Sequence, residues 1–172
     1  MAKWTPMSGR EDIHTISLLV ANKPGVLVRI ALIFSRRGFN IESLVVSPTF
    51  DGRFSRMTIT AQGDPGTLVQ IVKQAQKLVD VVNASEHTPR EAVLREFALI
   101  KVKVPADKRV EVLQVVNHFK SQTVDIAPES IIVQTTGSSE KIDAMVQMLD
   151  QYGILELVRT GKVLMARGKE ST

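Results

Sequence analysis

The residues best suited to ligand chemistry form one short turn, Asn22-Lys23-Pro24-Gly25, between an apolar strand-like run and a helical run that begins at Val26. Pro24 fits the first turn of a helix, and Gly25 removes a side chain where free backbone N–H groups point outward. Such a helix start beside an Asn amide can hold a small anion such as a carboxylate. The alternative is a strand-to-helix turn with no ligand, because such turns are common.

Length and composition limit the class of protein. The 172 residues can form one medium domain or two small ones, and 44% apolar with 23% charged residues is typical of a globular chain. No apolar run approaches the roughly 18 residues of a membrane span, so we expect no membrane partner. Residues 1–12 lack the apolar core of a signal peptide and predict a short, flexible lead-in.

Cysteine and charge usage exclude further classes. The absence of cysteine excludes disulfides, thiolate metal sites and cysteine nucleophiles, and it fits a reducing compartment. The formal charge of +4 permits nucleic-acid binding, but the basic residues are scattered and Arg36-Arg37 falls in the last turn of a predicted helix. The aromatic side chains that the expected strands offer are Phe54 and Phe97, near their starts, and the polar strand faces carry Thr, Ser and Arg, so we expect no nucleic-acid partner.

The first half of the chain alternates strand and helix patterns. The expected elements are a strand over 14–20, a helix over 26–37, strands over 40–46 and 56–61, a helix from Pro65 to Leu78 and a strand over 79–83. Asp51-Gly52 predicts the hairpin turn between the second and third strands. In the third strand apolar and polar side chains alternate, so its second face is polar or covered by another element.

The second half repeats this order after a polar connection. We expect a strand over 97–104, a helix from Asp107, short strands over 124–126 and 131–133, a helix from Ser138 to Gly153 and a strand over 154–158. The predicted fold is α+β, with two ferredoxin-like βαββαβ domains over residues 13–87 and 97–172 and a linker over 88–96. The second copy has Asp107 where the first has Gly25, and an acid there would repel a carboxylate.

Catalytic chemistry is not indicated. His14, His87 and His118 lie in different elements without a carboxylate or second histidine at metal-ligand spacing, so we expect solvated or capping side chains and no metal site. The sequence has no nucleophile elbow and no phosphate-binding glycine-rich loop, and Gly161 and Gly168 are too isolated to indicate a site. We therefore predict that the chain is not an enzyme by itself and has no catalytic residues.

Several stretches together resemble the ACT-domain family and, more narrowly, the small regulatory subunits of acetolactate synthase (acetohydroxyacid synthase). These stretches are His14–Leu27, Phe34–Leu44, Ser55–Ile59, Arg95–Val102, Tyr152–Gly161 and Ala166–Gly168. The resemblance covers nearly the whole chain beyond the first dozen residues. The turn at Asn22 and Gly25 alone would mark only some ACT domain, whereas the combination is specific.

The resemblance implies a non-catalytic, cytoplasmic protein that forms a homodimer through its N-terminal ACT domain, followed by a C-terminal ferredoxin-like domain. It implies a separate catalytic subunit as partner, which carries thiamine diphosphate, Mg and FAD, while this chain has no cofactor of its own. That partner makes acetolactate and acetohydroxybutyrate on the way to branched-chain amino acids. The small subunit activates it and confers feedback inhibition, usually by valine, with leucine and isoleucine as further effectors to consider.

The resemblance also implies an effector site at the dimer interface. The matching positions are Asn22, Gly25, Val26 and Leu27 from one chain, and Asn40 and Ile41 from the other. Lys23 stands at a variable position, where it either adds charge attraction or points to water. Two alternatives remain: a free-standing amino-acid sensor that acts on another enzyme or regulator, and an enzyme whose site forms only at an oligomer interface.

Overall fold

The structure is a computed structural model that describes residues 6, 13–169 and 172, and the chain divides into two compact units. The N-terminal unit holds residues 13–94 together with the described part of 161–172, and the C-terminal unit holds residues 95–160. The last segment of the chain thus belongs with the first half. This differs from the expected boundary, which placed residues 161–172 in the second domain.

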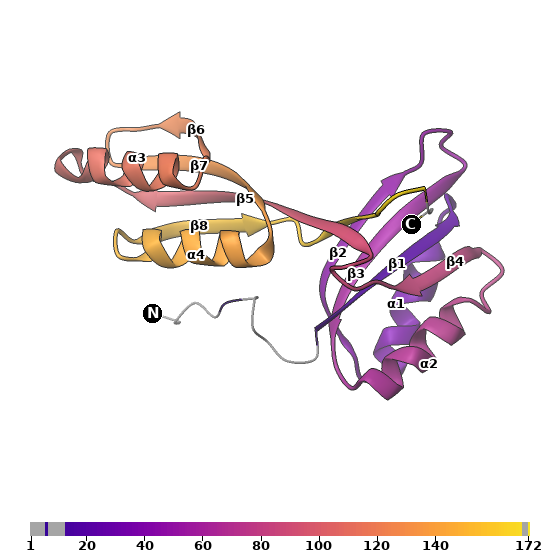
Figure 1. Cartoon of the computed structure of the whole chain (residues 1–172). Helices are drawn as coiled ribbons and strands as arrows, with labels where there is room; N and C mark the ends of the chain where they lie inside the picture. The colour runs from indigo at the N-terminus through magenta and orange to yellow at the C-terminus, as the bar shows by residue number, and fades with distance from the viewer. Residues whose placement is uncertain (1–5, 7–12, 170–171) are drawn as a thin grey trace. The chain divides into compact units, whose positions relative to one another are not determined.

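The N-terminal unit is one antiparallel sheet with two helices on one face (Figure 1). Its elements are β1 (Ile13–Ala21), α1 (Val26–Arg36), β2 (Asn40–Pro48), β3 (Phe54–Gln62), α2 (Pro65–Ala75) and β4 (Val81–Glu86). The strand order is β2-β3-β1-β4, with β2 at one edge and β4 at the other. The predicted βαββαβ order is confirmed, including the hairpin between β2 and β3.

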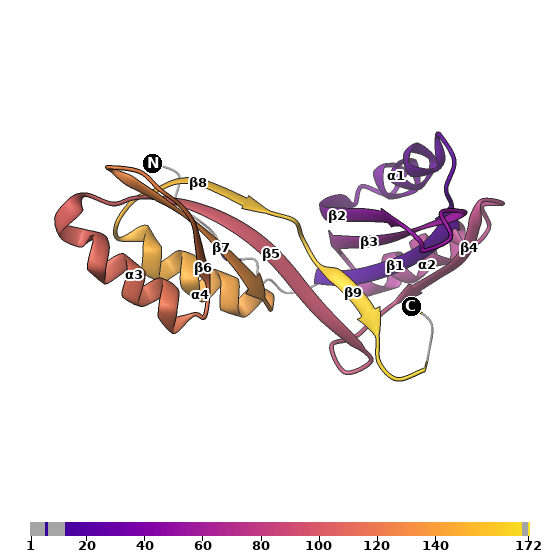
Figure 2. The same ribbon diagram turned by 90° about the horizontal axis from the view of Figure 1, so that it is seen from above.

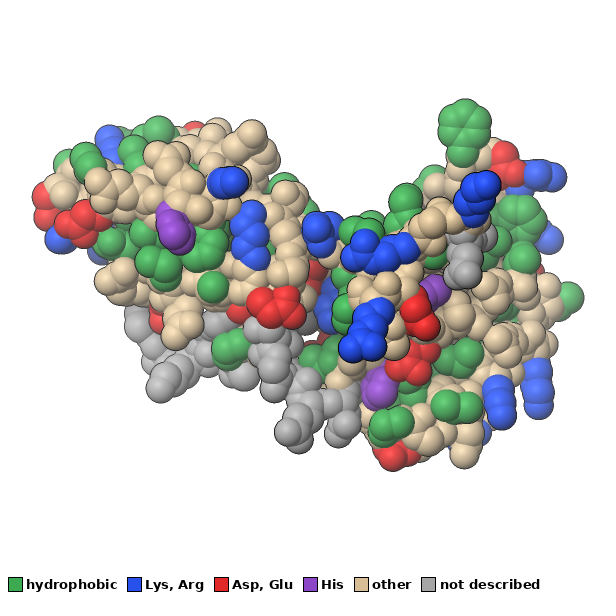
Figure 3. All heavy atoms as spheres, viewed as in Figure 1, with side chains coloured by type: hydrophobic (Ala, Val, Ile, Leu, Met, Phe, Trp, Pro, Cys, Tyr) green, Lys and Arg blue, Asp and Glu red, His purple; other side chains and the backbone are tan. Residues whose placement is uncertain are grey.

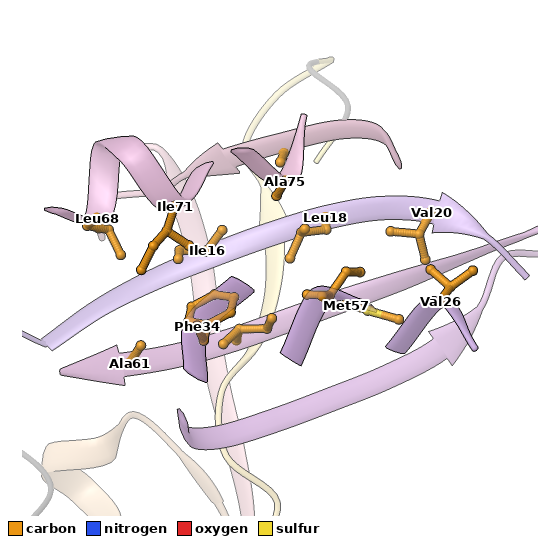
Figure 4. Close-up of a cluster of buried hydrophobic side chains, with 13 residues drawn as sticks. Ile16, Leu18, Val20, Val26, Phe34, Met57, Ala61, Leu68, Ile71 and Ala75 are labelled. Atoms are coloured by element: carbon orange, nitrogen blue, oxygen red, sulfur yellow. The ribbon is translucent and has the colours of Figure 1, made fainter. Parts of the chain in front are cut away.

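The core of this unit lies between the sheet and its helices (Figure 4). Every second side chain of β1, from Ile16 to Val20, points into this core and is at most 1% exposed; Ile16 lies near Phe34 of α1 and Ile71 of α2. This follows from the two-residue period of a strand and the 3.6-residue period of the helices. Gly38, at φ +71°, ends α1, and Phe39 N–H donates to the carbonyl of Phe34 at 3.1 Å.

The second face of the same sheet is covered by the chain's own last segment. Thr58 and Thr60 of β3 face away from the helices, yet they are only 5% and 1% exposed. Arg56, on that face, donates to the backbone carbonyl of Thr172. β9 (Val163–Ala166) pairs with β5, the long strand that links the two units, as Figure 2 shows. We call residues 161–169 and 172 the return segment. The sequence left open whether this face was polar or covered, and it is both.

The C-terminal unit has the same plan. Its elements are β5 (Ala92–Lys103), a 3₁₀ turn (Ala106–Lys108), α3 (Arg109–His118), β6 (Gln122–Ile126), β7 (Ser130–Gly137), α4 (Ser139–Asp150) and β8 (Ile154–Arg159). The strand order is β6-β7-β5-β8, and the sheet packs on both helices through a second apolar core. Both ferredoxin-like units are therefore present, as predicted.

Two local expectations were wrong. β5 begins at Ala92, inside the stretch expected as a linker, because its first residues pair with β9, which the sequence did not reveal. β4 begins at Val81 and not at Val79, which is 98% exposed. Asp80 instead forms part of a turn, because its carbonyl accepts from Ala21 N–H at 2.7 Å and its carboxylate pairs with Arg29.

A buried ionic cluster ties together three elements of the C-terminal unit. Arg159, at the end of β8, donates through Nε to Glu96 of β5 at 3.0 Å and through Nη1 to Asp143 of α4 at 2.5 Å. The three side chains are 8%, 1% and 6% exposed. Ser139 donates to the other oxygen of Glu96 at 2.6 Å. Removing one member would leave buried charge without compensation, which is costly.

We predict that Arg159→Met destabilises the C-terminal unit by about 3 kcal/mol or more, because Glu96 and Asp143 would lose their shared cation. Urea unfolding followed by circular dichroism measures this loss. Lys101→Met is the matched control, since Lys101 forms a solvent-exposed pair with Glu156 at 2.9 Å in the same unit. Solvent screens that pair, so we expect a much smaller change. Equal losses in the two variants would contradict the prediction.

Candidate ligand-binding site

The start of α1 leaves backbone donors open toward solvent. Gly25 is the N-cap residue at φ +83°, and no side chain caps the helix. A Cβ at Gly25 would meet no atom within 4 Å, so the backbone conformation, and not space, requires glycine. Helix geometry leaves the N–H groups of Leu27 and Val28 without intrahelical partners, and no carboxylate lies in the first turn. This helix start is therefore available to an anion.

Asn22 is held beside this helix start by the hairpin between β2 and β3. Its Nδ2 donates to the carbonyl of Gly52 at 3.0 Å, and its backbone N–H donates to the carbonyl of Arg53 at 3.0 Å. With its amide nitrogen engaged, the side chain can offer its oxygen as an acceptor to a ligand cation. The sequence indicated Asn22 but did not reveal that the hairpin positions it.

The hairpin turn is organised by Asp51. Its carboxylate accepts from the Thr49 hydroxyl at 2.7 Å and from Arg53 Nε at 2.7 Å. These bonds, that from Thr49 above all, lower the pKa of Asp51 to about 2. Asp51 therefore stays ionised at neutral pH, and the turn that holds Asn22 keeps its shape there.

Two of the predicted site residues, Asn40 and Ile41, lie at the start of β2. Asn40 Nδ2 donates to Glu42 Oε1 at 2.8 Å, so Glu42, which the sequence reasoning missed, orients Asn40. Asn40 and Ile41 border an open hollow of about 430 Å³ at the end of α1. Its remaining lining residues are Ala31, Phe34, Ser35, Gly38 and Phe39.

The structure separates the predicted residues into two groups. Asn22, Lys23, Gly25, Val26 and Leu27 stand at the beginning of α1, whereas Asn40 and Ile41 follow its end. The 11 residues of α1 span roughly 16 Å at 1.5 Å per residue. An amino acid is too small to reach both groups within one chain.

The side chains of the first group differ in their accessibility. Val26 is 2% exposed and packs in the core, so its side chain is not available to a ligand, although the resemblance placed it in the site. Leu27 is 41% exposed and does face outward. Lys23 is exposed and adds positive charge near the helix start.

The corresponding turn of the C-terminal unit is chemically different. It forms a 3₁₀ turn that contains Asp107, and α3 then begins at Arg109 with Glu111 in its first turn. The hydrogen bond from Lys108 lowers the pKa of Glu111, so this carboxylate stays charged. Two acids thus occupy the place where the N-terminal unit has open N–H groups; the sequence predicted Asp107, and Glu111 is added by the structure.

The histidines are more engaged than expected. His14 Nδ1 lies 2.6 Å from Glu86 Oε1, and His87 Nε2 lies 2.7 Å from the Ser17 hydroxyl. The Ser17–His87 pair has the composition of a nucleophile and its base, but Ser17 is only 2% exposed. The pair therefore serves as an internal hydrogen bond in this structure. Among residues 13–169, no group of three or more His, Asp or Glu side chains could hold a metal ion.

The face of the molecule drawn in Figure 3 has no large patch of only basic or only acidic side chains. Basic and acidic side chains are interspersed on each unit in Figure 3. None of the helices in the described part of the chain is both long and apolar enough to cross a membrane.

The fold and the helix-start site define the first unit as an ACT-type regulatory domain. The sequence profile described as the AHAS small subunit-like ACT domain matches residues 16–83, and that of the small subunit of acetolactate synthase matches residues 95–168. The chain belongs to the acetolactate synthase small-subunit family.

Individual relatives agree along nearly their whole length. The chain is 47% identical over 157 residues to a probable acetolactate synthase small subunit of Archaeoglobus fulgidus, covering 91% of this chain and 98% of that one. It is 43% identical to the small subunit of Mycolicibacterium smegmatis, covering 94% and 95%. The crystal structure of the acetolactate synthase small subunit from Thermotoga maritima, 41% identical, superposes with a TM-score of 0.81 and covers 92% of this chain and 99% of that one.

Proposed function

We propose that this chain is the regulatory, non-catalytic subunit of a cytoplasmic acetolactate synthase, that it activates the catalytic subunit, and that it confers feedback inhibition by valine. The observation that carries the proposal is the start of α1, where open N–H groups stand beside the Asn22 amide and no carboxylate competes. Membership of the small-subunit family supports the proposal that the binding partner is the catalytic subunit of acetolactate synthase. In this proposal thiamine diphosphate, Mg and FAD all belong to the catalytic chain.

An α-amino acid matches the chemistry of this site. Its carboxylate would accept from the N–H groups of Leu27 and Val28, where the helix dipole favours negative charge. Its ammonium would donate to amide oxygens of Asn22 and Asn40. A branched side chain would rest on Leu27 and Ile41. Since one methylene changes apolar binding by roughly 1–3 kcal/mol, leucine and isoleucine are the competitors to compare with valine.

The second half-site would come from a second copy of the chain. The C-terminal end of β2 lies at the same end of the sheet as the end of β1. Pro48 of β2 pairs with Ser55 of β3, and Phe54, the residue before Ser55, pairs with Ala21 of β1. The last residues of β2 therefore lie at the end of the sheet where Asn22 begins the turn. If β2 pairs antiparallel with β2 of a second copy about a twofold axis, the start of one strand meets the end of the other. Asn40 of the second copy then approaches Asn22.

The exposed side chains of α1 and β2 support this pairing. Leu27, Val28 and Leu32 of α1 are 41%, 61% and 45% exposed, which is unusual for apolar residues along one helix of a monomer. β2 is an edge strand whose only charged residue is Glu42. An edge with so little charge favours pairing with another strand. A homodimer would cover both features.

Feedback inhibition requires valine to distinguish two arrangements of the complex. In the proposed mechanism one arrangement of the paired ACT domains supports the active catalytic subunit, and valine binds more tightly to another. The interface is suited to this role because each effector molecule would touch two chains, so its binding depends on how they are paired.

The deciding experiment is acetolactate formation by the cognate catalytic chain, with and without this protein, across a valine titration. We expect stimulation that valine reverses. Stimulation without any valine effect would overturn the effector assignment. No stimulation of a competent catalytic chain would overturn the regulatory-subunit proposal and favour a sensor of another enzyme. Turnover by this protein alone would favour an enzyme.

We predict that Gly25→Asp and Asn40→His each weaken valine inhibition by about tenfold or more while stimulation persists, because each alters only the effector site. The readout is the valine concentration for half-inhibition. Gly168→Asp is the control for Gly25→Asp, since Gly168 also has positive φ and open space around its Cβ position. If a folded effector-site variant also loses stimulation, then stimulation and valine inhibition do not depend on different residues, and the prediction is wrong.

Mixing the two variants tests the interface directly. In a dimer of one Gly25→Asp chain and one Asn40→His chain, one site carries both changes and the other carries neither. Statistical mixing therefore restores about a quarter of the sites to full affinity, by the symmetry of a twofold interface. Isothermal titration with valine measures this fraction after subunit exchange. A site formed within one chain predicts no recovery upon mixing.

A further inference from the structure

The return segment touches the N-terminal sheet at one position where no side chain fits. Gly161 is buried, at φ +83°, and a Cβ there would lie 2.5 Å from the hydroxyl oxygen of Ser43 and 3.7 Å from its Cα. Side chains do not tolerate a contact of 2.5 Å at Cβ, so β2 or the return segment would have to shift. Glycine at position 161 thus lets the return segment approach β2 more closely than any other residue type would.

Ser43 is two residues from the effector half-site on the same strand. β2 has a bulge between Ile41 and Ser43, and the extra residue is Glu42, which accepts from Asn40. Bulges re-aim the side chains beside them, so the position of Ser43 bears on the direction of Ile41 and Asn40. Neither the Ser43 hydroxyl nor that of Thr60, its neighbour in β3, has a hydrogen-bond partner among the described residues. The contact with Gly161 therefore acts through packing.

The two residues that precede Gly161 are bonded to the C-terminal unit. Only Thr160 separates Gly161 from Arg159, whose guanidinium is bound to Glu96 and Asp143. Thr160 N–H also donates to the carbonyl of Phe97 at 3.0 Å. Gly161 is therefore the first residue of the return segment after a strand end that is bonded within the C-terminal unit.

We propose that Gly161 is a positioning residue for the effector site: its contact with Ser43 holds the bulged start of β2 so that Asn40 and Ile41 meet the ligand. The proposal rests on the proposed effector function and adds a role for the return segment in it. Pressure on Ser43 tilts the bulge, which turns Asn40 away from the ligand ammonium. Effector affinity then changes although Gly161 itself touches no effector.

The test compares Gly161→Ala with Gly168→Ala in the full-length protein. Both glycines have positive φ, but only Gly161 has a neighbour at its Cβ position, so Gly168→Ala controls for backbone strain. We expect Gly161→Ala to weaken valine binding by roughly three- to thirtyfold and to speed hydrogen–deuterium exchange over residues 40–46. Gly168→Ala should change neither. Equal effects of the two variants, or normal β2 exchange in Gly161→Ala, would overturn the proposal.

Two further variants separate positioning from folding. Ser43→Gly combined with Gly161→Ala removes the clash, so binding and exchange should return toward wild type, and a failure to recover counts against the proposal. If Gly161→Ala does not fold, Ser43→Val presses on Gly161 from the strand side without positive φ, and unchanged binding and exchange there would overturn the proposal. Absence of valine binding by the wild-type protein refutes only the effector assignment, because β2 exchange still measures the positioning contact.

Discussion

The left-handed backbone of Gly25 is the constraint on which the candidate site depends. A residue at φ +83° lets β1 turn directly into α1 without a side-chain cap, so the first N–H groups of the helix stay open. Asp64 caps α2 through Thr67 N–H at 2.8 Å, and Ser138 caps α4. α3 has no side-chain cap, but Asp107 and Glu111 stand at its start. Only α1, among these four helices, begins without a side-chain cap and without an acidic residue.

The length of α1 then decides what that site can be. A ferredoxin-like unit returns the chain to the sheet one helix length away from where it left, so the turn at Gly25 and the start of β2 lie at opposite ends of the unit. A small ligand can touch both only across two copies. In the proposed dimer, two copies would therefore each contribute one half of the site that encloses the amino acid.

Local signals in the sequence were sufficient for most elements and for the uncapped helix start at Gly25. The turn at Asn22, the hairpin turn at Asp51-Gly52 and the alternation in β3 each depend on near neighbours, and all were predicted. Long-range contacts were not. β9 lacks a pattern of its own and forms because β5 extends to meet it, and the covering of Thr60 depends on residues a hundred positions later. Val26 was a candidate site residue only through the family resemblance, and the structure places its side chain in the core.

The return segment gives the two similar units different properties. In the N-terminal unit it covers the polar sheet face, so Ser17, Thr58 and Thr60 become interior residues and the sheet is restrained on both sides. A sheet packed on two faces moves less freely than one packed on a single face, because each shift must be accommodated by both layers. Its edge strand β2 carries Asn40, and Gly161 packs against Ser43 of that strand. In the proposal made above, the layer that closes the sheet would also position one half of the ligand site.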